Sequence, residues 1–80
     1  MEEEGFVISN KIRKALFIEI ASGETSLNRI IRKHRLIEQA ARKAAEELKE
    51  HGIIEESKEG YKLTDLGAKI YGKLKGNEIL

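Results

Sequence analysis

The stretch GIIEESKEGYKLTDLG, Gly52 to Gly67, contains a predicted β-hairpin and the start of the helix that follows it. Two isoleucines lead into an acidic run, and then Tyr61 and Leu63 alternate with Lys62. This pattern predicts one strand over residues 53–57, a turn at 58–60 and a returning strand over 61–64. Gly60 stands where a three-residue hairpin loop requires a positive φ. Because a two-stranded hairpin is marginal alone, helices must bury its apolar face.

Residues before the hairpin recur at helical spacing. The acidic N-terminal segment is expected to be a mobile leader, whose apolar FVI residues either pack back on the domain or form a short edge strand. A first helix is predicted to begin at Ser9 or Asn10, because either side chain can accept from free first-turn amides. Gly23 is predicted to end this helix in the left-handed conformation.

Two further helices are predicted between Gly23 and the hairpin. The first is short, begins at Thr25 or Ser26, and ends around residues 33–36. The second spans about 37–51 and is expected to end at Gly52. Its predicted buried face consists of Ile37, Ala41, Ala44, Ala45 and Leu48.

A last helix is predicted after the hairpin, capped by Thr64 or Asp65. It contains Gly67, which is expected to permit tight packing, and Gly72, which is expected to shorten or fray its end. The predicted organisation is a leader over residues 1–8, one domain over 9–75 and a tail over 76–80.

Positive charge is concentrated in one part of the chain. The 80 residues carry a formal net charge of +1. Residues 29–43, however, hold six lysine or arginine residues and one glutamate, a net +5, so the rest of the chain sums to −4. This asymmetry indicates that one region of the domain binds an anionic partner, such as nucleic acid.

Several classes of function are not expected. The chain has no cysteine for a disulfide or a thiolate metal site, and His34 with Glu38 supplies two metal ligands without a third. We expect neither an enzyme nor a bound cofactor, because no nucleophile with its base and no glycine-rich phosphate loop is recognisable. A small-molecule effector is not expected at this size. With no long apolar run and no secretory leader, a cytoplasmic protein without membrane contact is expected.

Three segments together resemble the winged helix-turn-helix superfamily, as found in small prokaryotic and archaeal transcriptional regulators. GETSLNRII (23–31) resembles the short second helix, LKEHGIIEE (48–56) the end of the recognition helix, and YKLTDLG (61–67) the return strand of the wing with the start of the last helix. They stand at the superfamily's usual spacings, and the resemblance covers about residues 9–75. The resemblance implies a mainly α fold with a small β-hairpin: a three-helix core, a two-stranded wing and a C-terminal helix.

The resemblance also implies sequence-specific binding of double-stranded DNA by a transcriptional regulator, with the helix over 37–51 in the major groove. The candidates for base contact face outward early in that helix: Gln39, Arg42 and Lys43. The candidates for backbone contact lie on the preceding helix, the turn and the hairpin: Arg29, Arg32, Lys33, Arg35, Lys58 and Lys62. The wing departs from the superfamily's pattern because it carries Glu55, Glu56 and Glu59. Phosphate would repel them, so a minor role is expected for the wing.

The same residues allow other interpretations. Arg42 and Lys43 can instead pair with the glutamates four residues further on, as on any solvated helix face. The domain can also be a protein-interaction module that docks an acidic partner, or a non-specific chromatin- or replication-associated DNA binder. A regulator of this kind is commonly a homodimer. Its candidate dimer surface is Phe17 with Ile18, the FVI segment, or the last helix.

Overall fold

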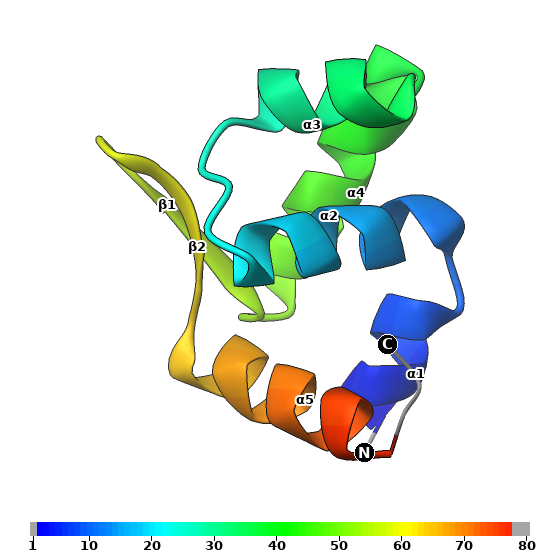
Figure 1. Cartoon of the computed structure of the whole chain (residues 1–80), viewed down its shortest axis with the longest axis vertical. Helices are drawn as coiled ribbons and strands as arrows, with labels where there is room; N and C mark the ends of the chain where they lie inside the picture. Colours follow the sequence, from blue (N-terminus) through cyan, green and yellow to red (C-terminus); the bar gives the residue numbers. More distant parts are fainter. Residues whose placement is uncertain (1, 78–80) are drawn as a thin grey trace.

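Helices make up most of the molecule, and a hairpin precedes the last of them (Figure 1). The computed structural model describes residues 2–77. The elements in chain order are α1 (Glu2–Ile8), α2 (Lys11–Ala21), α3 (Leu27–His34), α4 (Glu38–Glu50), β1 (Ile54–Ser57), β2 (Gly60–Leu63) and α5 (Asp65–Gly76). Among the described helices, none has the length and apolar composition needed to cross a membrane. The fold is therefore mainly helical with a small hairpin, as predicted.

The hairpin is antiparallel, and its turn is shorter than the sequence predicts. Ser57 lies opposite Gly60, so the turn consists of residues 58–59. Gly60 has the expected positive φ, 109°. The backbone N–H of Tyr61 donates to the carbonyl oxygen of Thr25 (3.0 Å), which ties the loop before α3 to the edge of β2. The hairpin is thus held by the helical part of the molecule.

Polar side chains cap three of the helices. Asn10 accepts from two amides of α2 (2.9 and 3.0 Å), Ser26 from one amide of α3 (3.3 Å), and Thr64 from one amide of α5 (3.0 Å). Each is one of the two residues that the sequence offers at that position. The helix α4 differs, because Ile37 precedes it and makes no side-chain cap.

The segment before Ser9 is helical, so the expected edge strand does not form, and the other alternative, that the FVI residues pack back on the domain, is confirmed. Val7 is fully buried in the core. The ring of Phe6 stacks on the ring of His51 at the end of α4, with 3.9 Å between centroids and 18° between planes. This burial orders the segment, because its apolar side chains leave water only when α1 packs against the other helices.

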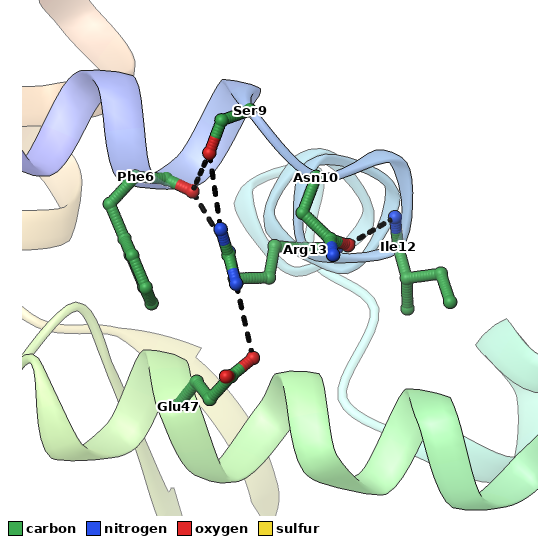
Figure 2. A network of polar contacts seen from close by, with 6 residues as sticks. All are labelled: Phe6, Ser9, Asn10, Ile12, Arg13 and Glu47. Carbon is green, nitrogen blue, oxygen red and sulfur yellow. Dashed lines mark hydrogen bonds and ion pairs between the residues drawn. The ribbon is translucent and has the colours of Figure 1, made fainter.

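One arginine joins α1 to two other helices (Figure 2). The guanidinium of Arg13 on α2 lies 3.9 Å from the centroid of the Phe6 ring, and its Nε donates to the Phe6 carbonyl oxygen (2.8 Å). Its two terminal nitrogens donate to Ser9 Oγ (3.1 Å) and to Glu47 Oε1 on α4 (3.2 Å). Arg13 therefore fixes α1 against both α2 and α4 through directional contacts.

Side chains from all the helices meet in one core. Its buried members are Val7, Leu16, Phe17, Ile20, Leu27, Ile30, Ala41, Ala44, Ala45, Leu48, Ile53, Ile54, Ile70 and Leu74. Phe17 and Val7 have no exposed area and pack within one chain, so these two residues cannot belong to the expected dimer surface. Ile37 is 74% exposed rather than buried. It precedes α4 with an extended backbone (φ −71°, ψ 124°), so the helical periodicity does not apply to it.

The two helical glycines of α5 have different surroundings. Gly67 is buried, and a Cβ there would overlap the carbonyl oxygen of Ile53, which confirms the predicted tight packing. Gly72 has open space around it, and α5 continues through it to Gly76 instead of ending early. Residues 78–80 of the expected tail lie outside the described residues.

Candidate nucleic-acid interface

The predicted contact residues lie on α3, α4, the turn between them and the hairpin. All nine are exposed: Arg29, Arg32, Lys33, Arg35, Gln39, Arg42, Lys43, Lys58 and Lys62. The two helices pack against each other directly, and a shallow hollow between them is lined by Asn28, Ile31, Arg32 and Glu38. The structure therefore brings the positive charge of residues 29–43 onto two adjoining helices.

Arg42 connects these two helices. Its Nη2 donates to Asn28 Oδ1 on α3 (3.1 Å), and its Nε pairs with Glu38 Oε2 on α4 (2.9 Å). The predicted alternative partner, Glu46, instead accepts from Lys49 (3.4 Å). Arg42 thus braces α3 against α4, and its guanidinium is partly occupied by protein acceptors. Asn28, which completes the brace, is a contact that the sequence did not indicate.

Two cations of α3 are paired with glutamates that precede α3 in the chain. Arg29 Nε lies 3.1 Å from Glu24 Oε2, and Lys33 Nζ lies 2.9 Å from Glu19 Oε2. The backbone N–H of Ser26, more than Arg29, holds the pKa of the Glu24 carboxyl below its usual value. Glu24 is therefore held largely by the backbone at the start of α3.

Glu19 accepts from two side chains of α3 at once. The same oxygen, Oε2, lies 2.9 Å from Lys33 Nζ and 2.8 Å from His34 Nε2. The Glu19 side chain is only 15% exposed, whereas that of Lys33 is 67% exposed. Lys33, followed by His34, lowers the pKa of the Glu19 carboxyl below its usual value. These contacts fasten the end of α3 to α2.

Three of the cations in residues 29–43 have side chains without a protein partner in the part of the chain that the structure describes. The side chains of Arg32, Arg35 and Lys43 make no hydrogen bond or ion pair with other residues in the described range 2–77. They lie on α3, in the turn and on the exposed face of α4, respectively. Gln39, one turn before Lys43 on that same face, is exposed as well. On α3, α4 and the turn between them, these four residues are the part of the predicted set whose side chains keep their hydrogen-bonding capacity unused by the described residues.

The hairpin adds more acid than base to this surface. Lys62 pairs with Glu55 across the two strands (3.3 Å), and Lys49 of α4 pairs with Glu56 (3.2 Å). Glu56, followed by Glu46, raises the pKa of the Lys49 ammonium. Tyr61 is half-buried, and this burial raises the pKa of its hydroxyl. Lys58 at the tip is thus the predicted hairpin cation that is left without a protein partner in the described residues.

The turn from α3 to α4 departs twice from local preferences. Arg35 adopts the left-handed conformation (φ 53°, ψ 46°), which costs a non-glycine residue about 1–2 kcal/mol. The helices α2 and α4, by contrast, are followed by Gly23 and Gly52 with positive φ. Ile37 stands at the N-cap of α4, where a polar residue would add about 1 kcal/mol. Stability alone therefore does not explain the residues of this turn.

Metal chemistry has no assembled site in this part of the molecule. Among residues 2–77, no three histidine, cysteine or acidic side chains lie close enough together to hold an ion. His34 contacts Glu19 on α2 rather than Glu38, with which the sequence could have paired it.

No family model matches the chain, and neither the curated proteins nor the solved structures include a significant match. Functional assignment therefore depends on the geometry and charge of the α3–α4 surface. The chemistry that this surface offers is multiple charged and amide donors on two rigid helices, which suits a large anionic ligand with repeated acceptors.

Proposed function

We propose that this protein is a winged-helix transcriptional regulator that binds double-stranded DNA sequence-specifically. In this proposal α4 is the recognition helix in the major groove, α3 approaches the phosphate backbone, and β1 and β2 form the wing. The element order and the direct packing of α3 on α4 support it. The observation that carries the proposal is the presence of three unpaired cations, Arg32, Arg35 and Lys43, around the first half of α4.

Gln39 and Lys43 are the proposed base-contacting residues. A glutamine amide can form two hydrogen bonds with adenine, and a lysine can donate to guanine. Arg42 has a different role here, because Asn28 and Glu38 already occupy its guanidinium. We assign it to the α3–α4 brace, with a phosphate contact when DNA displaces Glu38.

The paired cations can still contribute to binding. Exposed ion pairs are worth only about 0–1 kcal/mol, and the side chains of Arg29 and Arg42 are 60% and 50% exposed. Phosphates can therefore replace Glu24 and Glu38 as partners. Three unpaired cations predict a slope of log affinity against log salt of about −3, and recruitment of paired cations moves the slope toward about −5.

A second candidate is a protein-interaction module that docks an acidic partner on the same face. The acidic hairpin favours it, because Glu55, Glu56 and Glu59 are exposed on the hairpin and repel phosphate. This candidate predicts that the protein does not bind duplex DNA measurably at moderate ionic strength.

Titration of fluorescent duplexes at two salt concentrations tests the proposal. The double variant Arg32→Ala with Lys43→Ala should lose about tenfold or more in affinity. Its slope of log affinity against log salt should become less negative by about 2. The matched control is Lys11→Ala with Lys69→Ala, which removes the same charge from exposed positions on α2 and α5. Equal losses in the two double variants would show that only net charge matters. Loss of preference for a selected duplex over a random one, confined to the first variant, would support base readout.

A further inference from the structure

The Glu19 carboxylate contacts two side chains of different type, the ammonium of Lys33 and the imidazole of His34. A lysine side chain ordinarily stays protonated near neutral pH, whereas a histidine side chain ordinarily changes its charge between about pH 5 and 8. Lys33 and His34 both donate to the same oxygen of Glu19 at 2.8–2.9 Å. When His34 is neutral, Lys33 is the one cation that compensates Glu19 among the described residues. When His34 is protonated, two cations share one negative charge.

Exposure decides which cation a competing anion can take. The Lys33 side chain is 67% exposed and flexible, whereas the His34 side chain is 34% exposed and ends α3. Glu19 is mostly covered and cannot follow either partner into solvent. An anion arriving from solvent therefore takes Lys33, provided that His34 can compensate Glu19.

We propose that Glu19 and His34 form a pH-sensitive latch on Lys33. At a pH where His34 is neutral, Glu19 retains Lys33 and withholds it from phosphate. At a lower pH, protonated His34 holds Glu19 and leaves Lys33 for the DNA backbone. The inference rests on the proposed DNA binding and adds its regulation: affinity rises as the pH falls through the range in which histidine titrates.

The groups that act on this latch are few and identifiable. Glu19 belongs to α2, and the charged groups that contact it come from α3: Lys33 and His34. No other charged side chain in residues 2–77 pairs with His34. The other histidine, His51, is stacked on Phe6 at the opposite end of α4 and belongs to a different cluster.

Affinity for a selected duplex, measured at pH 8 and pH 6 with constant ionic strength, tests the latch. Wild-type affinity should rise about two- to fivefold at pH 6, a modest factor because freeing Lys33 replaces its ion pair with Glu19 by one with a phosphate. His34→Gln should abolish the rise, and Glu19→Gln should bind as tightly at pH 8 as the wild type does at pH 6. Unfolding curves at both pH values establish that each variant is folded.

The decisive variant is Lys33→Gln. If His34 acts by releasing Lys33, the pH effect disappears in this variant. If protonated His34 attracts DNA directly through its own charge, the pH effect persists, and the latch is overturned. A wild type that binds DNA without a pH effect also overturns the latch but leaves the proposed function standing. A wild type that binds no duplex overturns both. His51→Gln should retain the full pH effect.

Discussion

Glycine at two positions of one helix gives a direct test of the packing described for α5. At Gly67 an added Cβ would overlap the Ile53 carbonyl oxygen, which also accepts from the backbone N–H of Thr64 (3.1 Å). Gly67→Ala should therefore destabilise the protein by about 1–3 kcal/mol through overpacking, despite the better helix propensity of alanine.

Gly72→Ala is the matched control, because Gly72 lies in the same helix and a Cβ added there would meet no atom of another element within 4 Å. This change should stabilise by up to about 1 kcal/mol. Urea unfolding of the two variants should thus give shifts of opposite sign. Two stabilising shifts would mean that α5 does not approach the Ile53 backbone as closely as described.

The cap of α4 offers a second test at the level of single residues. Ile37 leaves the first-turn amides of α4 without a side-chain acceptor and is itself 74% exposed. Ile37→Ser should stabilise the protein by about 0.5–2 kcal/mol, because the hydroxyl can accept from a free amide and little burial is lost.

Ser26→Ala should do the reverse at α3, where the existing hydroxyl accepts from the N–H of Arg29. Thermal unfolding of both variants compares a cap gained with a cap lost. A destabilising Ile37→Ser substitution would contradict this account and would indicate that the isoleucine packs against the fold.

The packing of α1 depends on Arg13 of α2. Arg13 contacts Phe6 seven residues before it and Glu47 thirty-four residues after it. Arg13→Lys keeps the charge but loses the Nε donor and the planar group over the Phe6 ring. We expect a loss of about 1–2 kcal/mol in the free energy of unfolding.

Hydrogen exchange should locate this loss, because the amides of α1 should lose protection before those of α2 and α4. Lys11→Arg, the reverse exchange at an exposed position of α2, should change stability by less than about 0.5 kcal/mol. Uniform loss of protection across all helices in Arg13→Lys would mean that α1 has no separate stability.

These dependences explain which elements could be predicted from the sequence. The helices α2–α5 combine periodic apolar residues with polar caps or glycine ends, and both signals are local. The helix α1 has neither: its acidic residues resemble a solvated leader, and its docking requires His51 and Glu47, which only the folded chain brings near. Ile37 falls on the predicted buried face only when the helical periodicity is extended one residue beyond the start of α4.

The candidate interface divides in the same way. Exposure of the predicted residues on α3 and α4 follows from helical periodicity, and that of Arg35, Lys58 and Lys62 from their places in a turn and in the hairpin. Their pairing was not predicted correctly, because Glu19 and Glu24 lie outside the basic segment and reach it only through the packing of α2 and the loop on α3. The spacing of Arg42 with Glu46 and with Glu38 is equal, so sequence alone could not choose Glu38.

Over the whole molecule, net charge is a poor guide to what a polyanion encounters. The molecule measures 29 × 24 × 20 Å, and screening at 0.1 M salt reduces charge interactions beyond about 10 Å. A DNA backbone at α3 and α4 therefore responds mainly to charges on those helices. The net +1 of the chain conceals a positive surface there and acidic residues elsewhere.

Removing one negative charge from two places tests this locality. Glu38→Gln, in the first turn of α4, weakens one of the two contacts that occupy Arg42 and should raise duplex affinity about two- to fivefold at low salt. Its cost to the helix should be small, because an acidic residue near a helix N-terminus contributes about 0.3–1 kcal/mol.

Glu3→Gln removes the same charge from α1, away from α3 (Figure 1), and should leave affinity nearly unchanged at 0.1 M salt. Lowering the salt to about 0.01 M extends the screening length to about 30 Å, so the two variants should then converge. An equal gain for both at 0.1 M would show that the ligand responds to net charge. The α3–α4 surface would then have no special part in binding.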